Sequence, residues 1–158
     1  MKTNKPVKPY DFDRLKSYSL WLLGRRDYSE KELRDKFLSK QAIPEDIEKA
    51  IIFLEEYGYV DDLKFTSNFI NSAVNYKGHG PIRIRQELSR KGIPSDCASE
   101  ALEDSDVDWV EQCRELRLRK YKKPPESFQE KQKQMAFLAR RGFTMDTIFK
   151  AYESRDDE

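Results

Sequence analysis

The sequence carries an internal repeat with a period of 50 residues. Sliding the chain against itself by this interval aligns residues 38–44 with 88–94 and then with 138–144, and three aspartates also coincide: Asp46, Asp96 and Asp146. Repeats of this size bury their apolar faces on their neighbours, so each copy is one layer of a continuous core. The chain is therefore expected to form three tandem units in an elongated, curved stack rather than a globule.

Each unit is predicted to be a three-helix repeat, which makes the chain all-α. Only six glycines are present, and apolar residues recur with the 3.6-residue period of a helix rather than alternating. The predicted helices are 12–24, 30–40 and 44–57, then 62–76, 81–91 and 94–103, then 108–121, 128–141 and 145–153. The predicted organisation is a flexible segment 1–11, helical repeats 12–58, 59–105 and 106–153, and an acidic tail 154–158.

Helix starts and ends are marked by residues with a defined capping role. Ser29 and Glu32 have the spacing of a capping box, with Tyr28 and Leu33 placed to form a hydrophobic staple around it. Ser127 and Glu130 repeat the box. Proline tolerates the first position of a helix, and glycine favours the left-handed residue that ends one. These roles are assigned to Pro44, Pro81 and Pro94, and to Gly58, Gly92 and Gly142.

Composition excludes several classes of protein. The charged and hydrophobic fractions are each 37% and the mean hydropathy is −0.90, and no apolar run approaches the roughly 20 residues of a membrane span. We therefore expect a soluble, cytoplasmic and monomeric protein without a membrane or small-molecule partner. Cys97, Cys113 and His79 are too scattered for a metal site, and no phosphate loop or nucleophile motif is present. Neither a cofactor nor enzymatic activity is expected.

The net charge of +1 conceals strong segregation along the chain. Residues 95–111 contain seven acidic side chains and no basic one, whereas residues 114–141 contain ten basic and three acidic side chains. A second basic stretch covers residues 77–91. The candidates for contact with DNA or with an acidic protein surface are the following basic residues: Lys77, Arg83, Arg90, Lys91, Arg114, Arg117, Lys120, Lys122, Lys123, Lys133, Arg140 and Arg141.

Four of these candidates are predicted to form a row. Arg83 and Arg90 share a helix face away from the apolar seam of Ile84 and Leu88, and Lys133 and Arg140 lie 50 residues further on. Their own helix has the predicted seam Phe128, Met135 and Leu138. The same positions in the first repeat hold Leu33 and Lys40, so the row is expected to weaken there.

Simpler explanations remain open for other residues. Trp21, Trp109 and the tyrosines are expected to pack rather than to stack on bases. The segment 77–81 fits a helix–helix turn or a phosphate-binding nest. Asp61 and Asp62 fit a helix N-cap better than a magnesium site.

Segments 28–33, 58–65, 77–81 and 84–93 carry short motifs in a fixed order. These motifs resemble the RecX family of bacterial recombinase regulators, particularly its proteobacterial members. The resemblance covers residues 12–152, and Asp106, Asp108 and Trp109 add to it in the third repeat. Val60 and the pair Gln41 and Ala42 depart slightly from the family pattern. The motif residues, read as structural, are Tyr28, Ser29, Glu32, Leu33, Gly58, Tyr59, Asp61, Asp62, Phe65, Gly78, Gly80, Pro81, Ile84, Leu88 and Gly92.

The resemblance implies a fold of three three-helix repeats and a function in DNA recombination, repair and the SOS response. A RecX-like protein is expected to bind the RecA nucleoprotein filament in its groove or at its end. It would inhibit the ATPase, coprotease and strand-exchange activities of RecA without catalysis of its own, and contact with single- or double-stranded DNA is open. A stand-alone DNA-binding module, a structural adaptor that uses residues 95–111, and an enzyme remain as alternatives.

Overall fold

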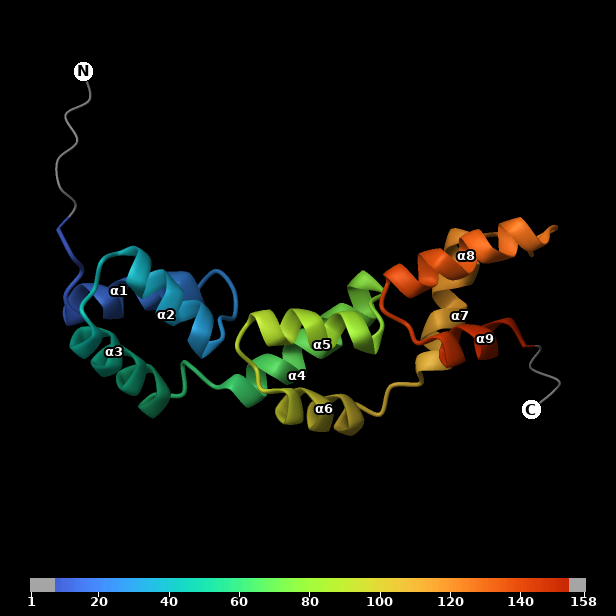
Figure 1. Cartoon of the computed structure of the whole chain (residues 1–158). Coiled ribbons are helices and arrows are strands. Elements are labelled where there is room, and N and C mark those ends of the chain that lie inside the picture. The colour runs from blue at the N-terminus through green and yellow to red at the C-terminus, as the bar shows by residue number, and fades with distance from the viewer. Residues whose placement is uncertain (1–7, 154–158) are drawn as a thin grey trace, which may run out of the picture. The chain divides into compact units, whose positions relative to one another are not determined.

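The computed structural model describes residues 8–153, and these form helices joined by short turns, with no strand in that range (Figure 1). All predicted helices except the fourth begin and end within one residue of their observed bounds, so the all-α class is confirmed. Residues 1–7 of the predicted N-terminal segment and the tail 154–158 lie outside the described range. The elements are α1 (Phe12–Leu23), α2 (Glu30–Ser39), α3 (Pro44–Glu56), α4 (Asp62–Ser72), the π-helical turn η1 (Ala73–Lys77), α5 (Pro81–Arg90), α6 (Ser95–Asp104), α7 (Trp109–Lys120), α8 (Phe128–Arg140) and α9 (Met145–Tyr152).

The chain divides into two compact units, unit 1 up to Phe65 and unit 2 from Thr66, and the division falls within α4. Unit 1 contains α1, α2 and α3, and unit 2 contains η1 and α5 to α9. The repeat bounds predicted from sequence stay predictions, because compact units and repeats divide a chain by different criteria.

Unit 1 is organised by the predicted capping box of α2. The Ser29 hydroxyl accepts a hydrogen bond from the Glu32 amide at 3.2 Å, and the Glu32 carboxylate accepts one from the Ser29 amide at 3.1 Å. These bonds satisfy two amides that the helix start would otherwise leave unpaired. The helix then buries Leu33 and Phe37 against α1 and α3, where Leu15 and Ile51 complete the same core cluster.

The helix ends show that the interval between the first and second repeats is 51 residues, not the 50 that the sequence self-comparison predicts. Helix α2 ends at Ser39 and Gln41 takes the left-handed conformation, with φ of 60°; α5 ends at Arg90 and Gly92 does so, with φ of 83°. Gln41 is therefore the counterpart of Gly92, a role that the 50-residue alignment gives to Ala42. The interval of 50 holds between α5 and α8, where Gly142 has φ of 102°.

Side-chain burial gives the same register. Phe37 is fully buried like Leu88, whereas Leu38, which the 50-residue alignment pairs with Leu88, is 59% exposed. The prolines shift likewise, since Pro44 is the first residue of α3 but Pro94 is the N-cap of α6 rather than its first residue. The counterparts of Arg83 and Arg90 in the first repeat are consequently Glu32 and Ser39, not Leu33 and Lys40.

Within unit 2, backbone hydrogen bonds connect the start of α5 to the end of α8. The amide of Gly80, at the start of α5, donates to the carbonyl of Arg141 at 2.8 Å, and the amide of Ile82 donates to the carbonyl of Gly142 at 3.0 Å. The first amides of one helix and the last carbonyls of the other thus satisfy each other. On the far side of this joint, Cys113, Leu138 and Ile148 form the core shared by α7, α8 and α9.

Several predicted side-chain environments are wrong. Tyr57, Tyr59 and Tyr76 were expected to pack but are 67%, 49% and 87% exposed. Trp21 was expected to pack but is 58% exposed, and Phe128, assigned to the apolar seam of α8, is 74% exposed. Every residue from 128 to 133 is exposed, so the core contacts of α8 begin only at Gln134, and the helical period does not show where a neighbour begins. A further error, at Arg114, concerns the candidate site.

Candidate functional site

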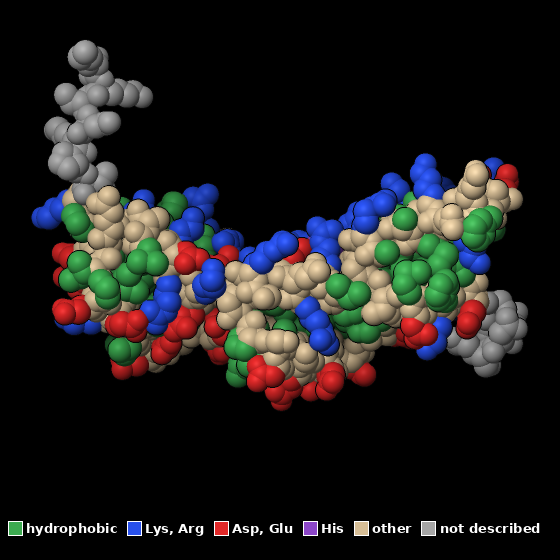
Figure 2. Space-filling model, in the orientation of Figure 1, with side chains coloured by type: hydrophobic (Ala, Val, Ile, Leu, Met, Phe, Trp, Pro, Cys, Tyr) green, Lys and Arg blue, Asp and Glu red, His purple; other side chains and the backbone are tan. Residues whose placement is uncertain are grey.

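The predicted basic row occupies one edge of unit 2. Arg83 and Arg90 come from α5, and Lys133 and Arg140 occupy the equivalent positions of α8, the helix that abuts the start of α5. We call these four residues the basic row. Figure 2 shows Lys and Arg side chains along the α5 and α8 edge of unit 2, while Asp and Glu side chains gather over α6.

Three members of the basic row are free of internal partners. Arg90, Lys133 and Arg140 are exposed, and none of them forms an ion pair with any residue in the range 8–153. Arg83 differs, because its Nε lies 3.0 Å from the Glu87 carboxylate. Since unpaired cations on one surface add their fields, this edge attracts anionic surfaces such as nucleic-acid phosphates.

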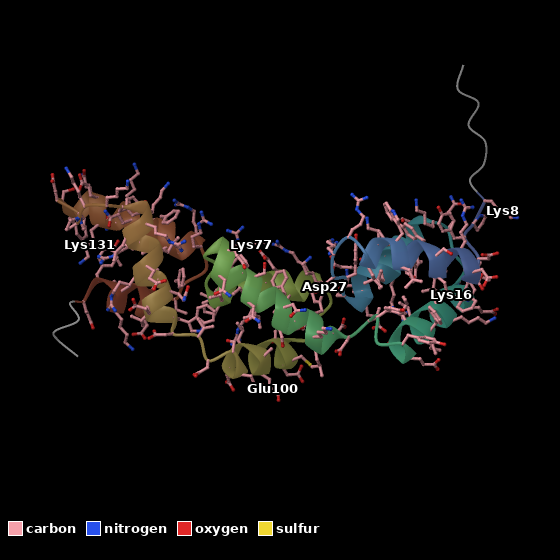
Figure 3. All side chains as sticks on the ribbon, turned by 180° about the vertical axis from the view of Figure 1, so that it is seen from behind. Lys8, Lys16, Asp27, Lys77, Glu100 and Lys131 are labelled. Atoms are coloured by element: carbon pink, nitrogen blue, oxygen red, sulfur yellow. The ribbon has the colours of Figure 1, made fainter. Side chains whose placement is uncertain are left out.

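A group of acidic residues in unit 2 lies on a different side from the basic row, although Glu87 pairs with Arg83 inside the row. Helix α6 carries Asp96, Glu100, Glu103 and Asp104, all exposed, and Glu100 extends from α6 away from α5 in Figure 3. The exposed carboxylates of α6 and the unpaired cations of the basic row therefore form two separate charged surfaces of unit 2.

Lys77 and Arg141 lie at the joint between α5 and α8, and Lys91 follows the other end of α5. The Arg141 guanidinium donates to the carbonyl of Lys77 at 3.2 Å and lies 5.2 Å from the Phe137 ring, and the ammonium groups of Lys77 and Lys91 both lie over Phe69. Arg141 thus supports the joint, while Lys77 and Lys91 contact α4, and all three add positive charge to unit 2.

The segment 77–81 is a helix–helix turn. The amides of His79 and Gly80, which a phosphate nest would need, already donate to the carbonyls of Ala73 and Arg141. These two amides are therefore not available to a phosphate, which favours the helix–helix turn over the phosphate nest.

Arg114 is wrongly predicted as a contact residue. Its side chain is buried, with a guanidinium that donates to the Glu111 carboxylate at 3.1 Å and to the carbonyl of Lys150 at 3.3 Å. A buried arginine with these partners holds α7 against α9 and does not reach a ligand. Arg117 is half-buried with its guanidinium 4.5 Å from the Tyr152 ring, so it too serves the packing of the third repeat.

The three remaining candidates lie at the end of α7. Lys120, Lys122 and Lys123 are exposed, and they line a shallow hollow together with Tyr121 and Gln134. Lys120 also lies over the Phe137 ring at 5.4 Å. This lysine cluster remains open to solvent and extends the positive surface of the third repeat.

Most motif residues are buried or make local contacts at helix ends in the described fold, and their structural role stays a prediction. Tyr28, Leu33, Phe65, Ile84 and Leu88 are buried. The Asp61 carboxylate accepts from the amides of Leu63 and Lys64, which confirms its N-cap role at α4, and the Asp62 carboxylate accepts from the Glu30 amide at 3.0 Å. Gly58 and Gly78 are left-handed, with φ of 71° and 64°. Ser29 and Glu32 form the capping box, Gly80 and Pro81 begin α5, Gly92 follows it, and Tyr59 is 49% exposed.

Sequence reasoning missed the group of ionisable residues around His79. This imidazole is buried, and its Nδ1 lies 3.8 Å from the Glu87 carboxylate that also holds Arg83. Burial lowers the pKa of His79, with the cations Arg83, Lys77 and Arg141 acting in the same direction and Glu87 opposing them. The four-residue spacing of Arg83 and Glu87 was a readable signal for one pair of this group.

The described residues contain neither a metal-binding cluster nor a membrane-spanning helix. Between residues 8 and 153 no group of three or more His, Cys, Asp and Glu side chains is arranged to hold a metal ion. Over the same range, no helix has the length and hydrophobicity to cross a membrane.

Three family models match most of the chain. They describe the first, second and third three-helix domains of RecX and match residues 16–54, 61–102 and 106–152, respectively. Together with the nine α-helices of the described residues, these matches confirm the fold of three tandem three-helix units.

Proteins and crystal structures that are similar to this chain are named RecX. Regulatory protein RecX of Salmonella arizonae is 40% identical over 94% of this chain and 95% of its own, and that of Cronobacter sakazakii is 40% identical over 90% and 93%. The crystal structure of RecX from Lactobacillus salivarius superposes with a TM-score of 0.79 at 24% identity, over 94% of this chain and 98% of that one. A second crystal structure of regulatory protein RecX gives 0.75 at 25% identity, over 93% and 73%.

Proposed function

Because the chain belongs to the RecX family, we propose that it regulates RecA, mainly negatively, by binding the RecA–DNA filament in its groove or at its end. Bound there, it inhibits ATP hydrolysis, coprotease activity and strand exchange. The protein acts as a cytoplasmic monomer and needs no catalytic chemistry of its own.

The observation that carries the proposal is the alignment of unpaired cations on α5 and α8. Arg90 and Arg140 occupy equivalent positions of two helices whose ends are hydrogen-bonded to each other, so their spacing is set by the backbone. A filament presents phosphates and acidic side chains at regular intervals, and a matching series of cations gains affinity at each one.

The proposed mechanism is steric. Protomers of a filament move relative to one another during ATP turnover, and a protein that spans neighbouring protomers hinders that movement. Occupation of a filament end would instead block addition of the next protomer. Both modes use the basic row in the same way, as the surface that orients the protein on its anionic target.

The test compares two charge-reversal variants that change net charge equally. Arg90→Glu with Arg140→Glu alters the basic row, whereas Lys49→Glu with Lys64→Glu alters two exposed lysines of unit 1 outside it. Binding to RecA assembled on labelled single-stranded DNA is measured over a series of salt concentrations, and circular dichroism checks helicity.

We expect the row variant to bind at least about tenfold more weakly and to show a shallower dependence on salt, because each lost phosphate contact lowers the slope by about 0.7 for single strands. The lysine control should bind nearly like the parent protein. Equal weakening in both variants would mean that net charge alone matters and would discard the row. If the parent protein binds bare DNA as tightly as the filament, the stand-alone DNA-binding module replaces the proposal.

A further inference from the structure

Helix α1 carries a stripe of basic and aromatic residues beside its buried side, with Tyr18 partly buried against the core. Arg14, Tyr18, Trp21 and Arg25 follow one another at intervals of four, three and four residues from α1 into the turn after it, which places them along one face. We call these four residues the α1 stripe. The core side of the same helix is formed by Leu15, Ser19 and Leu22.

The aromatic rings of the stripe lie in a continuous series with cations around them. The rings of Tyr18 and Trp21 are stacked, with centroids 6.4 Å apart and planes at 17°, and the Arg25 guanidinium lies 4.9 Å from the Trp21 ring. At the other end, Tyr10 meets Tyr18 edge-on at 5.6 Å, and the Arg14 guanidinium lies 4.1 Å from the Tyr10 ring.

A further cation joins the series from α2. The Lys40 ammonium lies 5.5 Å from the Tyr10 ring and 5.3 Å from the Tyr18 ring. The amide of Tyr10 also donates to the Lys40 carbonyl at 3.2 Å, so the backbone fixes this end of the platform. Cations therefore flank the rings at both ends and between them.

These cations are unpaired, unlike four other cations of unit 1. Arg14, Arg25 and Lys40 form no ion pair with any residue between 8 and 153. By contrast, carboxylates hold the following cations of unit 1: Lys16, Arg26, Lys31 and Arg34. Lys16, labelled in Figure 3, extends toward α3, where it lies over the rings of Phe12 and Phe53.

The large exposed aromatic surface calls for an explanation. Trp21 is 58% exposed, although a tryptophan of a soluble protein is normally well buried. A flat ring beside unpaired cations suits both chemical parts of single-stranded nucleic acid. The bases can stack on the ring, and the phosphates can pair with the cations. A duplex keeps its base faces covered, so it could use only the cations.

We infer that the α1 stripe, together with Tyr10 and Lys40, binds single-stranded nucleic acid, with a base stacked on Trp21. This surface is separate in the sequence from the basic row of α5 and α8, and it goes beyond filament regulation, which requires no base contact. An acidic protein partner would use the cations but has no comparable group to stack on the ring.

The experiment uses Trp21 as its own reporter. In a Trp109→Phe background Trp21 is the single tryptophan, so its emission reports directly on stacking. The protein, without RecA, is titrated with oligothymidylate and with an abasic strand of equal length and phosphate count. Oligouridylate in a third arm distinguishes RNA from DNA as the source of the single strand.

We expect oligothymidylate to quench Trp21 emission and the abasic strand to leave it nearly unchanged. Trp21→Leu should weaken binding of oligothymidylate by about tenfold, whereas Phe128→Leu, which removes an aromatic ring of greater exposure in unit 2, should not. Equal emission changes with both strands, or unaltered affinity of Trp21→Leu, would overturn the inference. Because RecA is absent, neither result depends on the proposed regulation of the filament.

Discussion

The amide of Gly80 donates a hydrogen bond of 2.8 Å to the carbonyl of Arg141 and so joins the start of α5 to the end of α8. The neighbouring bond from Ile82 to Gly142 makes the joint bidentate. The positive end of the α5 dipole meets the negative end of the α8 dipole there, and this attraction favours the contact. The joint holds the two helices of the basic row at one fixed spacing, and the account of that row depends on it.

Gly80→Ala should break this joint. A Cβ atom at Gly80 would meet the Gly142 carbonyl group and would lie 2.6 Å from the amide nitrogen of Phe143, and backbone atoms cannot move aside cheaply. We expect a loss of about 2 kcal/mol or more in the free energy of unfolding, measured with urea, together with weaker filament binding.

Gly24→Ala is the matched control for that variant. Gly24 has a helical φ of −68° and the nearest atom to an added Cβ is at 3.4 Å, so a change within about 0.5 kcal/mol is expected. Equal stability of the two variants would refute the tight approach of α5 and α8.

The fold was predictable because caps and periodicity are local signals. Ser29 with Glu32 and Gly142 with its apolar neighbour indicate helix ends without knowledge of any tertiary contact. The register of the first repeat was not predictable, because Gln41 takes a left-handed conformation that sequence patterns assign to glycine.

The candidate site was predictable only in part, because burial depends on neighbours distant in sequence. The charge of Arg114 predicts a surface position, yet its guanidinium is buried and donates a hydrogen bond to the carbonyl of Lys150, 36 residues away in the sequence. The prediction for Trp21 is wrong in the opposite direction. Trp21 was expected to pack but is exposed, because the sequence does not show which side of α1 stays open to solvent. The basic row was found because its residues recur at one repeat interval.

Ser29→Ala should destabilise the chain by about 1 kcal/mol, because the hydroxyl that accepts from the Glu32 amide is fully buried and water cannot replace it there. Urea unfolding followed by circular dichroism gives the difference. Ser17→Ala, at an exposed position inside α1, should remain within about 0.5 kcal/mol of the parent. A Ser29 variant as stable as the Ser17 variant would contradict the capping box.

The two cysteines should react at very different rates. Burial raises the pKa of the Cys113 thiol to about 11, whereas Cys97 is partly exposed. Since the thiolate is the reacting species, Cys113 stays protonated and shielded at pH 8. A thiol reagent at this pH should modify Cys97 rapidly and Cys113 only after denaturation. Rapid modification of both in the native protein would show that the core of α7, α8 and α9 is open.

Acid should weaken the protein partly through His79. Burial lowers the pKa of this imidazole below its usual 6.5, helped by Arg83, so the unfolded chain takes up a proton at a pH where the native one does not. Stability therefore falls as the pH drops below about 6.5. His79→Gln removes this term, and its urea midpoint should fall less between pH 7 and pH 5. An identical fall in both proteins would exclude His79 as a source of the acid sensitivity.

The most direct test of filament regulation is to titrate the protein into RecA on single-stranded DNA at ratios far below stoichiometric and to follow ATP hydrolysis. Binding to the same DNA without RecA is measured in parallel at equal salt. We predict inhibition at concentrations where little of the bare DNA is occupied. Unchanged ATP hydrolysis, or inhibition that appears only once the protein covers the DNA, would contradict the account.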